Sequence, residues 1–337
     1  MKQEAFVARH QAEWAAFEHW LDLRGASPRR ARRMPADGAL EDSEIPARYR
    51  RLTQQLALAV RRGYSPQLTA RLQGLMQRGH AVLYRTPPPH WRRLAAFLVG
   101  GFPRLVREEW RCMLAAAVML YLPMLLVFAA IQLRPELSSA LFPPEQLTGF
   151  ESMYDPADAA RKLGRDGGTD VAMFGFYILN NVSIAFRTFA SGALAAVGSI
   201  FVLVVNGLMI GGVAGHLQAV GHGDPFWRFV CGHSSFELTA IVIAGGAGLQ
   251  IGLRLLAPGR QRRIDALVEG GRRGALLCAG VLLMLVIAAF IEAFWSSIGW
   301  MPASVKYSVA ALLWLLVGTW LWRGGRGRLP GDAGGAA

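Results

Sequence analysis

The sequence predicts an all-α, polytopic helical membrane protein with about six transmembrane helices and a helical N-terminal domain. Of the 337 residues, 53% are hydrophobic and only 18% are charged, which is unusually apolar for a soluble chain of this length. The first 109 residues hold 19 of the 36 Lys and Arg residues but only 10 of the 23 acidic ones. From Arg111 onward, long apolar runs dominate. These patterns exclude a simple soluble enzyme, a fibrous protein and a disordered chain.

Residues 1–89 are expected to form a helical cytoplasmic domain. Residues 25–45 are polar and rich in Pro and Gly, as in a linker, and amphipathic helices are predicted at about 47–62 and 66–86. Ser65 can cap the second of these helices, with Pro66 in its first turn. The apolar residues of an earlier helix recur at spacings of three to four: Phe6, His10, Trp14, Phe17 and Leu21.

Residues 90–110 alternate aromatic residues with arginines, as in an amphipathic helix that lies in the headgroup layer. A packing helix of the soluble domain is the alternative. The transmembrane domain is expected over residues 111–323, because six apolar runs there approach the ~20 residues that a bilayer core requires. The predicted spans are 112–133, 171–190, 193–217, 234–256, 275–298 and 305–322.

Few polar residues separate the second span from the third. Ser191 and Gly192 must form the turn there, or this region is broken or re-entrant.

The charges between the spans predict the topology. Segment 134–170 has four basic and seven acidic residues, whereas the connector 257–273 and the flexible tail 324–337 are basic. Basic segments remain in the cytoplasm. We therefore expect a multi-pass protein of the bacterial inner membrane with both termini in the cytoplasm and segment 134–170 outside it.

Small residues repeat every four positions on the third and fourth spans. This spacing lets helix backbones approach closely, within one chain or between two, and we expect a homodimer. The packing residues are Gly207, Gly211, Gly215, Ala244, Gly248 and Gly252.

Polar side chains within the apolar runs are the candidate functional residues: Asn180, Asn181, Arg187, Asn206, His233, Glu237 and Glu292. A charge at the bilayer centre costs at least about 3 kcal/mol, so such residues pair, face a wet cavity or perform a function. His233 and Glu237 are four residues apart and share one helical face. Arg187 is the expected counter-charge for Glu237 or Glu292.

Three interpretations of this network remain open: a structural polar network, a proton- or ion-handling site, and a metal site. The metal site would use His216, His222, His233 and Glu237, but the spacing is irregular, so we expect no metal and no cofactor. No catalytic motif is found and no nucleic-acid-binding motif, which predicts a non-enzymatic protein. Cys112, Cys231 and Cys278 fall within or at the edge of apolar runs and predict neither disulfides nor a zinc cluster.

Several of these stretches, in this order, resemble the stage II sporulation protein M family. They are Asn180–Gly192, Asn206-Gly207 with Gly211-Gly212, His233–Leu238 running into Ala244–Gly248, Pro258-Gly259, Arg262-Arg263 and Ile291-Glu292. Phe6 to Trp14, the Tyr49–Leu52 helix and Phe102-Pro103-Arg104 look like the longer bacterial branch. The family usually has a glycine after the histidine, where this chain has Ser234.

The resemblance implies a membrane component of machinery that remodels peptidoglycan, acting with cell-wall hydrolases and not as one. The longer branch often occurs beside genes for MoxR-type AAA ATPases. The predicted function is assembly or anchoring of an envelope complex, with membrane lipids, a second copy, and a MoxR-type system or cell-wall machinery as partners. The alternative is a proton- or ion-coupled transporter or channel that uses Glu237, His233, Glu292 and Arg187.

Overall fold

The computed structural model describes residues 2–25, 40–84, 90–157, 162–165 and 167–326. Within these residues all regular structure is helical, which confirms the all-α prediction. The chain divides into two compact units, Met1–Pro89 and His90–Ala337. Residues 26–39 of the predicted linker and most of the predicted tail lie outside the described residues.

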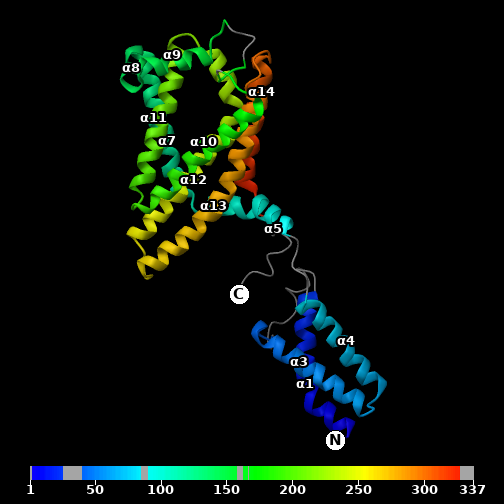
Figure 1. Cartoon of the computed structure of the whole chain (residues 1–337). Coiled ribbons are helices and arrows are strands. Elements are labelled where there is room, and N and C mark those ends of the chain that lie inside the picture. Colours follow the sequence, from blue (N-terminus) through cyan, green and yellow to red (C-terminus); the bar gives the residue numbers. More distant parts are fainter. Residues whose placement is uncertain (1, 26–39, 85–89, 158–161, 166, 327–337) are drawn as a thin grey trace. The chain divides into compact units, whose positions relative to one another are not determined.

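Three helices around an aromatic core make up the first unit: α1 (Gln3–Gly25), α3 (Ile45–Arg61) and α4 (Pro66–Leu83) (Figure 1). The predicted apolar stripe is its buried face, where Phe6, Trp14, Phe17 and Leu21 are each at most 2% exposed. Trp14 Nε1 donates to Gln55 Oε1 at 2.6 Å, so the buried indole keeps its hydrogen bond. α4 begins as predicted, because Ser65 accepts a hydrogen bond from the Leu68 amide.

Five helices of the described second unit are long and apolar enough to cross a membrane. They are α7 (Trp110–Leu133), α11 (Val197–Ala219), α12 (Gly223–Leu256), α13 (Arg263–Ile291), which continues as the π-helical turn η5 (Glu292–Ser296), and α14 (Ala303–Arg323). The chain is thus a multi-pass membrane protein.

A sixth long helix, α10 (Asp170–Ala190), packs against α12 and α13 in the same bundle. It is not among the five, because Asn180, Asn181 and Arg187 lower the apolar content of its 21 residues. Six crossings therefore remain a prediction.

Two helices extend well beyond the predicted spans. α12 begins at Gly223 and not near residue 234, and α13 begins at Arg263 and not near residue 275. A 34-residue helix such as α12 is about 51 Å long, more than the roughly 30 Å core of a bilayer. The predicted connector 257–273 therefore shrinks to residues 257–262, and Arg272 and Arg273 lie on a helix.

The basic segments of the second unit gather at one end of the bundle. Arg107, on α6 (Phe102–Glu108), donates to the Leu321 and Gly324 carbonyls at the end of α14, both at 2.5 Å. Arg254 on α12 and Arg273 on α13 pair with Glu109 at 3.6 and 3.3 Å.

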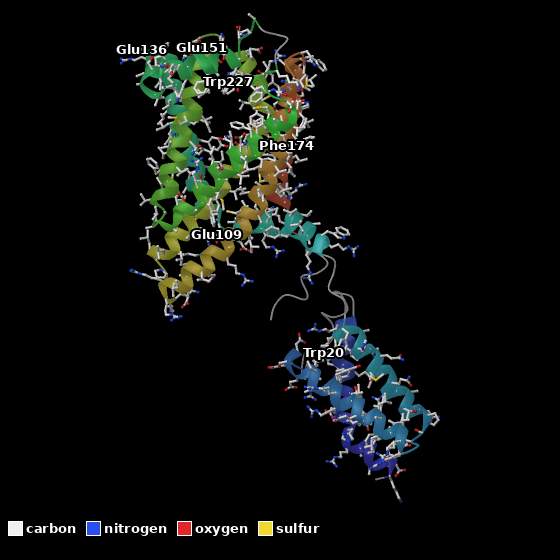
Figure 2. The ribbon with its side chains drawn as sticks, viewed as in Figure 1. Trp20, Glu109, Glu136, Glu151, Phe174 and Trp227 are labelled. Atoms are coloured by element: carbon white, nitrogen blue, oxygen red, sulfur yellow. The ribbon has the colours of Figure 1, made fainter. Side chains whose placement is uncertain are left out.

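Glu136 and Glu151 of the acidic segment lie at the opposite end from Glu109 (Figure 2). In that segment the helices are η3 (Pro135–Leu137), α8 (Ser138–Leu141) and α9 (Pro144–Met153). This separation is the arrangement that the predicted topology requires, while the side of the membrane remains a prediction.

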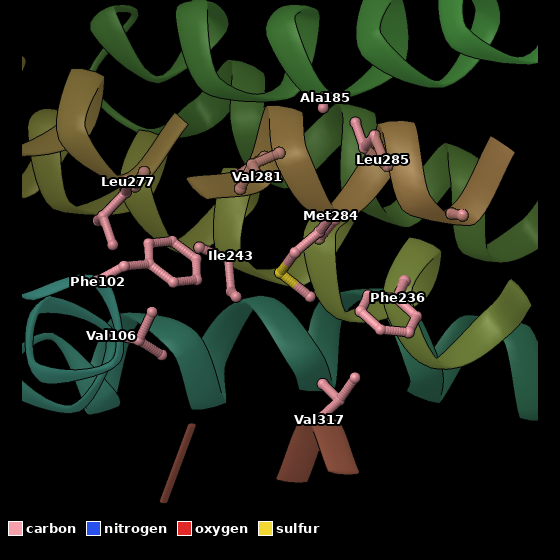
Figure 3. Packing of buried hydrophobic residues seen from close by; sticks show 14 of the residues in the cluster. Phe102, Val106, Ala185, Phe236, Ile243, Leu277, Val281, Met284, Leu285 and Val317 are labelled. Atoms are coloured by element: carbon pink, nitrogen blue, oxygen red, sulfur yellow. The ribbon is translucent and has the colours of Figure 1, made fainter. Parts of the chain in front are cut away.

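The chain between residues 90 and 110 is not one helix. α5 (His90–Ala96) leads through a π-helical turn, η2 (Phe97–Gly101), into α6. Trp91 is 67% exposed, whereas Phe102 is fully buried and packs with Val281 in the core of the second unit (Figure 3). The second half of this segment therefore packs on the bundle, and the position of the first half in the headgroup layer stays a prediction.

Ser191 and Gly192 do form the turn between α10 and α11. A short 3-10 helix, η4 (Ser191–Ala193), is followed by Ala195 and Ala196 with φ of 52° and 69°. A Cβ at Gly192 would lie 2.2 Å from the Gly248 carbonyl oxygen, so this turn packs directly on the backbone of α12.

The small-residue stripes pack within one chain. A Cβ at Gly207 would lie 2.3 Å from the Leu120 carbonyl oxygen, and one at Gly211 would lie 2.2 Å from that of Met124. Gly215 faces Ile131 further along α7. On α12, Gly248 faces Ser199 and Gly252 faces Ala196, both at the start of α11. Ala244 of the same helix is fully buried. In this structure these residues join helices of the same molecule.

Candidate functional site

His233 and Glu237 of α12 meet Glu292 of η5 in the second unit. One ligand atom from each residue lies within 4.8 Å of the other two. His233 Nε2 lies 3.6 Å from Glu237 Oε2. These three residues are called here the HEE cluster. His233 and Glu292 are buried, at 4% and 8% exposed, whereas the Glu237 side chain is half-buried, at 20% exposed.

The π-helical turn brings η5 against α12. A π turn inserts an additional residue and re-aims the side chains around it, and such turns often mark functional sites. Gly232 lets the two elements approach, because a Cβ there would lie 2.3 Å from Trp295 Cζ3. Ser296 Oγ then lies 3.1 Å from His233 Nδ1 and orients the imidazole.

α10 supplies a polar wall. Tyr177 and Asn181 are four residues apart on its buried face, and exposed Asn180 donates Nδ2 to Asn181 Oδ1 at 3.0 Å. The Asn181 amide neighbours the Glu292 carboxyl group. The geometry falls short of a hydrogen bond, so Asn181 Nδ2 and Glu292 Oε2 have no partner among the described residues. Buried polar atoms without partners are uncommon, which singles out this position.

Two of the predicted network residues lie elsewhere. Arg187 is exposed and donates Nε to the Ser183 carbonyl at 3.2 Å, and it forms no ion pair with Glu237 or Glu292 in the described chain. The expected pairing is wrong because six residues of α-helix rotate Arg187 about 120° away from Asn181. Asn206 donates to the Val202 carbonyl of its own helix at 2.8 Å.

Lys306 is a buried cation that is not among the predicted site residues. It is fully buried at the start of α14, and its Nζ donates to the Ser296 carbonyl at 2.7 Å. Nζ also lies 5.8 Å from the centroid of the Trp295 ring. A lone lysine at the end of an apolar run ordinarily extends to the interface, so no sequence pattern predicts this contact.

The segment after α9 covers the HEE cluster. The Leu163 amide donates to the Ser297 carbonyl at 3.0 Å. The centroids of the Tyr154 and Phe229 rings lie 5.8 Å apart, and those of the Phe229 and His233 rings lie 5.2 Å apart. Burial, reinforced by the charges of Glu292 and Glu237, raises the pKa of Tyr154. The cluster is therefore closed toward the acidic end of the bundle.

Two contacts hold the end of this segment at α10, and a third holds α9, which precedes it. Lys162 and Arg165 both bind Asp170 at the start of α10, and their hydrogen bonds, that of Lys162 first, lower the pKa of Asp170. His216 Nε2 lies 2.8 Å from Glu151 Oε1 and ties α11 to α9.

The four-residue metal site considered from the sequence does not assemble. His216 is occupied by Glu151, and His222 lies just before the first residue of α12. Only His233 and Glu237 of that set come together, and their third neighbour is Glu292, on another element. Chemically, an imidazole and two carboxylates at this range can share protons or bind a cation.

Two protein-family models match the chain. The model for the family described as "Stage II sporulation protein M" matches residues 112–297, more than half of the chain, and includes the whole HEE cluster. The model for a "Domain of unknown function (DUF8413)" matches residues 4–85, which make up nearly all of the first unit. No curated protein and no solved structure matches the chain. By its membrane domain, the chain belongs to the stage II sporulation protein M family.

Proposed function

We propose that this protein is a non-enzymatic component of the bacterial inner membrane that assembles or anchors an envelope complex. The observation that carries the proposal is the division of the chain into a membrane bundle of the stage II sporulation protein M family and a separate helical unit with its own closed core. A compact unit that needs no contact from the bundle to bury its aromatic residues is suited to bind a partner. A MoxR-type AAA ATPase or cell-wall machinery is the expected partner.

Orientation supports a cytoplasmic partner for this unit. Its chain enters the bundle at α5 and α6, and Arg107 of α6 lies at the end that gathers Arg254 and Arg273. Clustered arginines at one end of a bundle favour the cytoplasmic face and attract anionic headgroups. Both termini and the first unit are then in the cytoplasm.

In-cell cross-linking tests the proposal. The intact tagged chain is compared with variants in which exposed arginines of α3, Arg50 and Arg61, become Glu. Arg71→Gln is the matched control, because Arg71 is engaged by Glu18 at 3.0 Å. We expect an envelope protein or ATPase to be captured by the wild type and by Arg71→Gln and to be lost in the Glu variants. Equal capture by all forms, or capture of no such protein, contradicts the proposal.

The dimer remains part of the proposal, with a surface other than the small-residue stripes. Light scattering of the detergent-solubilised chain over a concentration series is expected to give the mass of two copies. A single-copy mass throughout the series removes the dimer.

Ion- or proton-coupled transport is the second candidate, and the buried HEE cluster favours it. Arg187 no longer belongs to that mechanism, since it is exposed on α10. Protein in liposomes with an enclosed pH-sensitive dye distinguishes the two functions. Proton movement that Glu237→Gln abolishes supports transport, whereas an assembly protein gives the same signal as empty liposomes.

A further inference from the structure

We propose that His233, Glu237 and Glu292 bind a divalent transition-metal ion, and that zinc is the ion this donor set fits best. The proposal does not depend on the assembly function. It rests on the geometry of the HEE cluster, on its charge and on two polar atoms without partners.

The distances between the donor atoms fit a single metal ion. In a tetrahedral zinc site with ligand bonds of about 2.0 Å, ligand atoms lie about 3.3 Å apart. His233 Nε2 and Glu237 Oε2 are 3.6 Å apart, and one carboxylate oxygen of Glu292 completes a set within 4.8 Å. A small movement of side chains closes these distances around one ion, and a water molecule can take the fourth position.

The orientation of the His233 imidazole also fits a metal ligand. A histidine that binds a metal usually donates its other ring nitrogen to an oxygen, which fixes the ring and its tautomer. Ser296 Oγ, at 3.1 Å from His233 Nδ1, is placed to accept that bond. In that tautomer the Nε2 lone pair faces the Glu237 carboxylate at 3.6 Å, where a cation can bridge the two acceptors.

The charges of the cluster also favour a cation. The buried carboxylate of Glu292 lies beside the half-buried carboxylate of Glu237, and no Lys or Arg nitrogen of the described chain lies within 4.0 Å of either one. The buried Lys306 donates to the Ser296 carbonyl instead. A buried charge without compensation is strongly unfavourable, and one divalent ion neutralises both carboxylates.

Two polar atoms beside the cluster also leave a place for an ion and its water. Glu292 Oε2 and Asn181 Nδ2 are buried and unpartnered beside each other. A bound ion would be coordinated by the carboxylate oxygen of Glu292. A water molecule on that ion would accept a hydrogen bond from the Asn181 amide.

The donor types select the metal. Mg²⁺ and Ca²⁺ require an all-oxygen shell of six or more ligands, and soft Cu⁺ requires thiolate or thioether ligands. One imidazole nitrogen with two carboxylate oxygens suits zinc, and among the described residues Cys231 has its Sγ directed to the Arg228 carbonyl. The sequence did not reveal this set because Glu292 is far from His233 and Glu237 along the chain.

Zinc content of the intact chain in detergent, measured by mass spectrometry after chelation and reloading with zinc, tests the proposal. We expect about one zinc per chain for the wild type and at least a tenfold weaker affinity for His233→Ala, Glu237→Gln and Glu292→Gln. His216→Ala is the matched control, because it removes another buried histidine that also faces a glutamate, and it should keep the zinc.

Three further readouts keep the proposal falsifiable. Cobalt in place of zinc should give the visible absorption of a tetrahedral site in the wild type and not in Glu292→Gln. Ser296→Ala should keep the zinc with about tenfold lower affinity, as expected when the partner of a ligating histidine is removed. Absence of bound zinc in wild type that elutes as a folded species, equal zinc in the three ligand variants, or displacement by millimolar Mg²⁺ overturns the proposal.

Discussion

Asp42 is held by two donors of the first unit. Trp20 Nε1 donates to Oδ1 at 3.1 Å, and Arg24 donates to Oδ2. The hydrogen bonds from Arg24 and then from Trp20 lower the pKa of Asp42. A carboxyl group whose pKa is lower in the folded state adds stability above its unfolded pKa of about 3.9, and that stability is lost as pH falls through the folded value.

Asp42→Asn should therefore lower the melting temperature of the isolated fragment 1–89 at pH 7. Because the carboxylate is largely exposed, the loss should be at most about 1 kcal/mol. The difference from wild type should shrink as the pH falls below about 4. Thermal melts followed by circular dichroism at several pH values measure it, and Glu44→Gln, in an exposed pair with Arg48, is the control. A difference that persists unchanged at pH 3 contradicts this account.

Single residues show where sequence reasoning succeeded and where it failed. His233 and Glu237 could be placed on one face because a four-residue spacing fixes their relative direction. Arg187 and Lys306 could not be told apart in the same way, since burial of a lone cation depends on which face a helix presents to its neighbours. The structure buries Lys306 against the Ser296 carbonyl and leaves Arg187 exposed.

Close contact between α7 and α11 depends on glycines of α11. Gly211→Ala should destabilise the bundle by roughly 1–3 kcal/mol, because its Cβ would lie 2.2 Å from the Met124 carbonyl oxygen and overpacking of this kind forces the backbones apart. Gly318→Ala on α14 is the matched control, because no atom lies within 4 Å of the new Cβ.

Thermal unfolding in detergent, followed by the accessibility of the half-buried cysteines to a thiol reagent, compares the two variants. Equal melting temperatures for Gly211→Ala and Gly318→Ala would show that the glycine is not needed for the contact.

The extent of each element was less predictable than its existence. The apolar runs located α7 and α14 to within a few residues, but α12 and α13 begin more than ten residues earlier than expected. The charged residues of these added turns find partners on neighbouring elements: Arg228 donates to the Gly299 carbonyl at 2.8 Å, and Arg273 pairs with Glu109 at 3.3 Å. The π-helical turn that carries Glu292 also arises from tertiary packing, which apolar periodicity does not encode.

At the scale of the whole molecule, the topology can be tested by labelling. With Cys112, Cys231 and Cys278 replaced by serine, Asp155→Cys should react with an impermeant thiol reagent in intact cells. Asp265→Cys, near the start of α13, should react only after permeabilisation. This result follows from the basic segments lying at one end of the bundle and staying in the cytoplasm. Reaction of both positions in intact cells contradicts the orientation.

The architecture could be predicted because composition, apolar length and charge bias all act over long stretches of chain. The meeting of η5 with α12 could not, since it depends on Gly232 admitting Trp295 and on a turn of unusual geometry. The family match covers the residues of both elements, and the structure shows how they come together.

α12 has one more consequence for the protein. His233 and Glu237 lie near the middle of this helix and Arg254 lies in its last turn, about 25 Å beyond Glu237 along the axis. Because the helix is continuous between them, a tilt imposed at the histidine must also displace the arginine and strain its bonds to Glu109 and Glu269. A displacement at the HEE cluster is thus carried to the basic end of the bundle by rigid-body motion of α12.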